Sequence, residues 1–108
     1  DSRDATVRGN VIRGNDESGL LGFDVRDATL AGNEIRGNGA YGMELRYTDR
    51  SAVRENEIRR NGDSGVVLQR SNDNVIVRNA VCRNLAALQI RVGDDSTGNE
   101  VRNNRLSC

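Results

Sequence analysis

Arginine and the acidic residues are the side chains of this chain that could do chemistry. The chain has 108 residues, its 16 basic residues are all arginine, and 16 Asp and Glu balance them to a formal net charge of zero. A guanidinium group binds a carboxylate through two parallel hydrogen bonds, so regularly spaced arginines could hold an anionic polymer. The charge balance leaves no broad positive field, and we do not expect a general nucleic-acid binder.

The sequence lacks the residues that histidine-based catalysis and zinc binding need. Histidine is absent, which removes the commonest general base and the commonest zinc ligand, and two cysteines cannot make a four-cysteine zinc site. Cys82 follows the apolar Val81 and is expected to point outward; it could pair with Cys108 or stay a free thiol. No apolar stretch is long enough to span a membrane.

A long repeat organises the whole sequence. Asn10, Asn33, Asn56 and Asn79 are spaced by 23 residues, and Asn104 follows after 25. A second Asn follows five positions later in four units, at Asn15, Asn38, Asn61 and Asn84. An apolar residue lies three positions before and two positions after each first Asn. These form two columns, Val7/Leu30/Val53/Ile76/Val101 and Ile12/Ile35/Ile58/Val81/Leu106. Such a period is typical of a solenoid.

A second block in each unit alternates apolar and polar residues, as a strand does. The blocks are Gly22–Arg26, Gly42–Arg46, Gly65–Gln69 and Ala87–Arg91. Aligned on their first residue, they predict two more inward columns, Phe23/Met43/Val66/Leu88 and Val25/Leu45/Leu68/Ile90. Each unit is therefore predicted to contain two short strands, each followed by a turn. We expect units to stack with parallel strands about 4.8 Å apart, and the turn asparagines to adopt the left-handed conformation and bond amide to amide.

These motifs resemble the right-handed parallel β-helix family, the pectate-lyase-like superfamily, and within it the Asn-x-Ile-x-x-Asn repeats of carbohydrate-binding domains and mannuronan C5-epimerases. The resemblance implies an all-β, single-stranded solenoid of about four to five coils of about 23 residues with open ends. A leucine-rich repeat has a similar period, but it needs leucine in most apolar columns.

The whole chain, 1–108, is expected to form one repeat domain. Asp1-Ser2-Arg3 aligns with Asp24-Val25-Arg26, so the chain opens inside a strand, and no capping helix is evident at either end. We therefore expect a fragment or module of a longer β-helix, in end-to-end contact with further coils or with another copy.

The outward positions of the second block are the candidate binding residues. They are Arg26, Glu44, Arg46, Tyr47, Gln69, Gln89 and Arg91. Stacked in register, their arginines would form a ladder for the carboxylates of a polymer. The alternative is that Glu44 with Arg46, and Asp24 with Arg26, only neutralise each other. A second column, Arg13/Arg36/Arg59, is flanked by Glu34 and Glu57 and is expected to be plain surface.

The sequence was also searched for catalytic and metal-binding residues. The stretch from Gly22 to Asp27 is similar to the Asp-Pro-His-Asp segment of mannuronan epimerases, with Val25 and Arg26 in place of Pro and His. The resemblance implies Asp24, Arg26, Asp27 and Tyr47 as catalytic candidates, with Tyr41 as an alternative acid. No confident catalytic residue follows. No cofactor is expected, although turn carboxylates at Asp27, Asp49, Asp73, Asp94 and Asp95 could bind calcium.

Two functions remain open from sequence. The first is a module of an extracellular or periplasmic carbohydrate-active protein that binds an acidic polysaccharide such as alginate or pectate, and in a longer parent helps to epimerise or cleave it. The second is a structural or adhesive spacer with no ligand chemistry. The partner expected is thus a polysaccharide, and neither nucleic acid nor a membrane.

Overall fold

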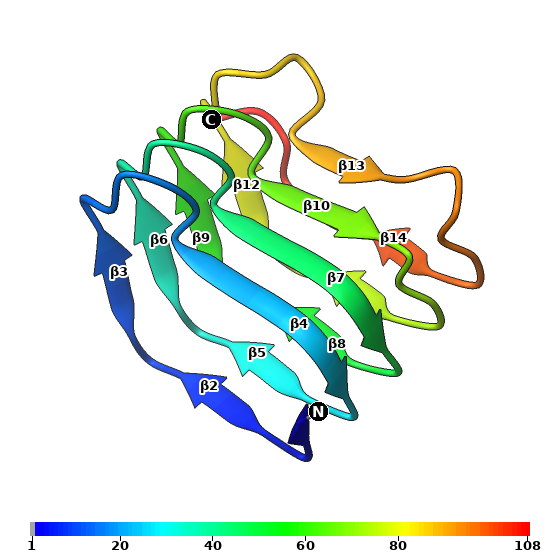
Figure 1. Cartoon of the computed structure of the whole chain (residues 1–108). Helices are drawn as coiled ribbons and strands as arrows, with labels where there is room; N and C mark the ends of the chain where they lie inside the picture. The colour runs from blue at the N-terminus through cyan, green and yellow to red at the C-terminus, as the bar shows by residue number, and fades with distance from the viewer. Residues whose placement is uncertain (1) are drawn as a thin grey trace.

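A computed structural model describes residues 2–108, which form a parallel β-solenoid (Figure 1). Three parallel sheets run along it. Sheet A has the order β1-β4-β7-β10-β13, sheet B the order β14-β11-β8-β5-β2, and sheet C the order β12-β9-β6-β3. The strands are β1 (Ser2–Arg3), β2 (Thr6–Arg8), β3 (Val11–Arg13), β4 (Leu20–Arg26), β5 (Thr29–Ala31), β6 (Glu34–Arg36), β7 (Met43–Asp49), β8 (Ala52–Arg54), β9 (Glu57–Arg59), β10 (Val66–Gln69), β11 (Val75–Val77), β12 (Ala80–Cys82), β13 (Ile90–Val92) and β14 (Glu100–Arg102). None of the described segments is a helix that could cross a membrane.

Each of the first four coils contributes one strand to each sheet, so it has three strands where the sequence predicted two, and the last described coil adds β13 to sheet A and β14 to sheet B. The reason is the corner at the first Asn of each repeat: Leu30 lies on β5 before it and Ile35 on β6 after it, and these strands belong to different sheets. The coil is therefore a triangle with a corner at each change of sheet, as the view along the stack shows (Figure 1).

The two apolar columns around the repeated Asn are confirmed in their register and in the burial of their central members, whereas the last members, Val101 and Leu106, are 43% and 51% exposed. On sheet B, Leu30 pairs in register with both Val7 and Val53. On sheet C, Ile35 pairs with Ile12 and with Ile58. The central members are fully buried and form one core with the inward residues of sheet A. Burying these side chains is the main favourable term, because no single coil encloses a core.

The sequence alignment of sheet A was wrong. The observed register places Leu20 opposite Met43, and Val66 opposite Met43 and Ile90. The glycine equivalent to Gly42 is therefore Gly19, which keeps the 23-residue spacing, and not Gly22. As a result Phe23 and Leu88, both predicted to point inward, are 58% and 61% exposed.

Asparagine ladders close the corners of the coil. The amide Nδ2 of Asn33 donates to Oδ1 of Asn56 at 3.0 Å, and the backbone N–H of Asn33 donates to the same oxygen at 2.9 Å. The pattern repeats from Asn10 to Asn104, which we call the outer ladder, and from Asn15 to Asn84, which we call the inner ladder. Buried amides are thus satisfied by their copies one coil away.

The amide stacking was predicted correctly, but the left-handed conformation was not. Positive φ belongs to the residue before each outer-ladder Asn, which is Gly9, Gly32, Glu55, Arg78 and Asn103 in successive coils. The Asn side chain then lies inside the corner, where it bonds to the neighbouring coil, while the preceding residue makes the left-handed turn.

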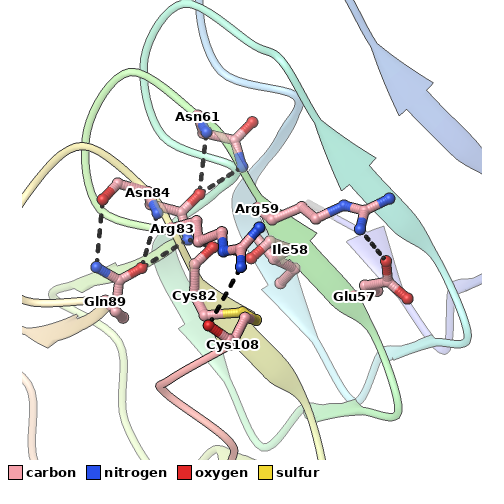
Figure 2. Close-up of a disulfide and its surroundings, with 9 residues drawn as sticks. All are labelled: Glu57, Ile58, Arg59, Asn61, Cys82, Arg83, Asn84, Gln89 and Cys108. Atoms are coloured by element: carbon pink, nitrogen blue, oxygen red, sulfur yellow. Dashed lines mark hydrogen bonds and ion pairs between the residues drawn. A yellow bond between two sulfur atoms is a disulfide. The ribbon is translucent and has the colours of Figure 1, made fainter.

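Gln89 ends the inner ladder from within the chain. Asn84 has no later Asn in its column, and its backbone N–H and Nδ2 donate instead to Oε1 of Gln89 at 3.0 and 2.9 Å. Nε2 of Gln89 in turn donates to the carbonyl oxygens of Asn84 and Ala86. The contacts between Asn84 and Gln89 are drawn in Figure 2. The last inner amide is therefore satisfied without a further coil.

Candidate functional site

A hollow of about 520 Å³ opens on the outer side of sheet A. We call it the arginine hollow, and its polar lining consists of Arg46, Tyr47, Gln69, Arg70, Arg91, Asp94 and Asp95. Val67, which is 1% exposed, and Leu68 supply apolar lining from β10. Arg46 lies in register with Gln69, and Val67 lies in register with Arg91, so β7, β10 and β13 place these groups on adjacent strands.

Neighbouring side chains hold each arginine of the hollow in place. Arg46 forms an ion pair of 2.7 Å with Glu44, whose side chain is only 12% exposed and accepts a second hydrogen bond from the hydroxyl of Ser18. Arg70 forms an ion pair of 3.4 Å with Asp95 and donates to the hydroxyl of Tyr47. Fixed guanidinium groups lose less conformational entropy when they bind a ligand.

Arg91 differs from the other two arginines. Its Nη2 donates to the hydroxyl of Tyr41 at 2.7 Å, and its guanidinium carbon lies 5.6 Å from the centre of the same ring. Among the described residues, no carboxylate lies within ion-pair distance of it. Arg91 is therefore a positive charge that is oriented but not neutralised by a direct partner.

An aromatic pair lies beside the hollow on the same sheet. The rings of Phe23 and Tyr47 meet edge to face, with centroids 5.5 Å apart, and both are substantially exposed. Leu21 on the same strand as Phe23 is 61% exposed. Sheet A thus presents an apolar platform on its earlier coils and guanidinium groups on its later coils.

The structure brings together four of the predicted binding residues, Arg46, Tyr47, Gln69 and Arg91, all of which line the hollow. Glu44 lies behind them as the partner of Arg46. The expected ladder of equivalent arginines is wrong, because Arg46 pairs with Phe23 and Arg91 pairs with Val67.

Two other predicted residues lie outside the hollow. Arg26 is in register with Asp49, beyond the bend of β4, and Gln89 is committed to the inner ladder. The sequence reasoning missed Arg70, and it named Asp95 only as a possible calcium ligand and not as a residue of the hollow. Arg70 follows β10 in the left-handed conformation, in the register position of Tyr47 and Asp24, so the 23-residue spacing from Tyr47 was the available signal.

Two of the four catalytic candidates, Asp27 and Tyr47, are each bonded to an arginine one coil later. Asp27 pairs with Arg50 one coil later at 3.1 Å, and this hydrogen bond holds the pKa of Asp27 below its usual value of 3.8. Tyr47 is bound to Arg70. Asp24 lies at the bend of β4 with φ of 58°, and Arg26 is in register with Arg3 and Asp49. Of the aligned triplet at the start, Ser2 and Arg3 pair with Val25 and Arg26 as predicted, and Asp1 lies outside the described residues.

Three of the five turn carboxylates predicted as calcium ligands, Asp27, Asp49 and Asp95, have protein partners. Asp49 accepts the backbone N–H of Asn72 at 2.9 Å, and Asp95 accepts that of Arg70 at 3.0 Å. The hydrogen bond from the Arg70 backbone holds the pKa of Asp95 below its usual value. Within residues 2–108, no three His, Cys, Asp or Glu side chains gather where they could hold a metal ion.

A disulfide links the last two coils on sheet C (Figure 2). Cys82 lies in register with Arg59, continuing the predicted column Arg13/Arg36/Arg59, and Cys108 covers it so that Cys82 is 1% exposed. Arg59 in that column pairs with Glu34 and Glu57, as expected for a neutralised surface. Nη2 of Arg83 donates to the carbonyl oxygen of Cys108 at 3.3 Å.

A protein-family model described as periplasmic copper-binding protein (NosD) matches residues 1–107. The chain belongs to the NosD family. Comparisons with curated proteins and with solved structures found no match. The NosD description agrees with the extracellular or periplasmic location expected from the sequence, and the coils agree with a β-helix repeat. The finer likeness to pectate lyases and epimerases is not confirmed.

The NosD description also raises the question of which residues could hold copper. The chain has no histidine, and its one methionine, Met43, is fully buried in the apolar core. The remaining soft donors are the sulfurs of Cys82 and Cys108. As a disulfide they carry no thiolate to ligate a metal, whereas as a reduced pair they are two adjacent sulfur ligands of the type that suits Cu(I).

Proposed function

We propose that this chain is a periplasmic β-helix module that binds an acidic polysaccharide across the outer side of sheet A. The observation that supports this proposal is Arg91, an oriented guanidinium group that has no direct carboxylate partner within residues 2–108 and lies in a hollow that also contains Arg46 and Arg70. A uronate carboxylate can accept two parallel hydrogen bonds from such a group.

The aromatic platform supports a carbohydrate over a small anion. The exposed Phe23 and Tyr47 rings offer an apolar surface for the C–H face of a sugar, while Gln69 offers both an amide donor and an acceptor for hydroxyl groups. Strands about 4.8 Å apart present these groups at intervals along the solenoid axis. An extended polymer lying across β4, β7, β10 and β13 would meet the platform first and Arg91 last.

The second candidate is a structural spacer without a ligand. It is favoured by the charge pairing in the hollow, since Glu44 neutralises Arg46 and Asp95 neutralises Arg70. For a spacer, Arg91 is only a surface residue fixed by Tyr41.

Substitution of Arg91 separates the two candidates. Retention of the chain in native gels containing alginate or polygalacturonate is expected to fall at least threefold in Arg91→Ala. Arg91→Lys should recover only part of it, because the ammonium lacks the planar fork. Arg102→Ala is the matched control, since Arg102 is an exposed arginine on sheet B, paired with Glu100 and remote from the hollow. Equal retention of wild type, Arg91→Ala and Arg102→Ala would favour the spacer.

A further inference from the structure

We propose that Asp94 accepts hydrogen bonds from the hydroxyl groups of the sugar whose carboxylate Arg91 binds, so that the arginine hollow selects polyuronates with free hydroxyl groups over O-acetylated ones. This inference rests on the proposed function, because it assigns a second contact to the same ligand. Asp94 lines the hollow and is exposed. Among residues 2–108, no side chain forms an ion pair or a hydrogen bond with its carboxylate.

The hollow lies where the repeat of 23 residues is interrupted. Val67 pairs with Arg91, which lies 24 residues later, and the backbone N–H of Ser71 donates to the hydroxyl of Ser96, which lies 25 residues later. One residue is therefore inserted before β13, and a second is inserted between Arg91 and Ser96. Insertions in a solenoid form loops on one face, which is often the binding face. The irregular part of this chain thus coincides with its larger hollow.

The second insertion forms the β-turn directly after β13 that carries Asp94 (Figure 1). The backbone N–H of Ser96 donates to the Gly93 carbonyl at 3.0 Å. Asp94 and Asp95 therefore occupy the two central positions of the turn. Asp95 accepts the backbone N–H of Arg70 at 3.0 Å and pairs with the guanidinium group of Arg70 at 3.4 Å. The turn is thereby fixed to the preceding coil, while Asp94 keeps a carboxylate that no other described side chain binds.

A carboxylate beside a guanidinium group suits a uronate ring. An ionised carboxylate only accepts hydrogen bonds, so its partners on such a ring are the hydroxyl groups. A hydrogen bond to an ionised acceptor is about twice as strong as one between neutral groups. An acetyl group removes the hydroxyl donor, and a site that binds a hydroxyl group discriminates strongly against an analogue that lacks it.

Charge repulsion alone predicts the opposite effect for Asp94. If its carboxylate only repelled a polyanion, removing its charge would strengthen binding. If it accepts hydroxyl groups, removing its charge weakens binding. The sign of the effect therefore distinguishes the two roles.

The test is electrophoresis of the whole chain in native gels with and without polygalacturonate. Asp94→Asn keeps the shape of the side chain and removes its charge, and we expect it to lower retention by the polymer at least threefold. Asp16→Asn is the matched control, because it changes the net charge by the same amount at an exposed carboxylate outside the lining of the hollow, and retention should not change. O-acetylated polygalacturonate should retain the wild-type chain at least threefold less, and should retain wild type and Asp94→Asn equally.

Two results overturn this inference. One is equal or higher retention of Asp94→Asn by polygalacturonate, and the other is equal retention of the wild-type chain by the acetylated and the unacetylated polymer. In both cases a loss of retention in Arg91→Ala still supports the proposed function. If neither polygalacturonate nor alginate retains the wild-type chain, the proposed function is wrong, and this inference is wrong with it.

Discussion

The strongest quantitative prediction concerns Asn56, in the middle of the outer ladder. Its side chain is 2% exposed and makes four hydrogen bonds. Oδ1 accepts the backbone N–H and the Nδ2 of Asn33, and Nδ2 donates to the Leu30 carbonyl and to Oδ1 of Asn79. Asn56→Ala removes all four and leaves buried groups of two neighbouring coils without partners.

At about 1 kcal/mol for each hydrogen bond lost, Asn56→Ala should lower the free energy of unfolding by about 4 kcal/mol. That is a large share of the about 5 to 15 kcal/mol that stabilises an ordinary domain. Asn10→Ala is the matched control, because the equivalent amide in the first coil is exposed and its side chain makes two hydrogen bonds, of 3.1 and 3.2 Å. We expect its cost to be about 1 kcal/mol or less.

Urea unfolding followed by far-ultraviolet circular dichroism measures both values. If Asn56→Ala and Asn10→Ala cost the same, or if Asn56→Ala costs less than about 1 kcal/mol, the ladder does not stabilise the solenoid as argued here.

Three further perturbations test other features. Gly65→Ala should destabilise by about 1 to 3 kcal/mol in urea unfolding, because its Cβ would lie 2.3 Å from Cγ1 of Val81; an unchanged midpoint would contradict the close packing of coils. The pKa of Asp27 is lowered by Arg50, so the stability that this pair contributes is present above pH 3.8 and is lost as pH falls through the lowered folded pKa; Arg50→Ala should flatten that part of the pH profile of the unfolding midpoint. Gln89→Ala should cost about 1 to 3 kcal/mol by leaving the last donors of the inner ladder unpaired, and thermal unfolding identical to wild type would show that water replaces Gln89 without loss.

Sequence periodicity predicted the stacking because register is set by residues that recur at the same interval. Val53 and Ile58 are fully buried, as the spacing required, and Asn56 stacks between its copies. The prediction for sheet A was wrong because it aligned blocks on a local pattern of glycine followed by alternating apolar and polar residues, and did not keep the 23-residue interval. Gly22 begins a run that looks like the one after Gly42, yet the backbone pairs Gly22 with Leu45.

The candidate site was harder to predict because its side chains are placed by bends of the backbone and not by the inward–outward alternation of side chains along a strand. Tyr47 and Arg70 adopt the left-handed conformation at the end of the flat part of sheet A, so their side chains leave the inward and outward alternation of a strand. Arg91 reached the hollow although its block was aligned two positions out of register. The pairing of Arg91 with Tyr41, 50 residues earlier, follows from neither spacing nor composition.

The amide-to-amide hydrogen bonds of the ladders all run from one coil to the next, so they form in the order of synthesis. Asn33, for example, donates one Nδ2 hydrogen back to the Val7 carbonyl, but its other Nδ2 hydrogen and its backbone N–H bind Oδ1 of Asn56, which is present only after the following coil has been made. A growing chain therefore always has one incomplete corner, at its newest coil, while older coils are already closed. Gln89, only five residues after Asn84, shortens that delay and lets the fourth coil complete its inner corner by itself.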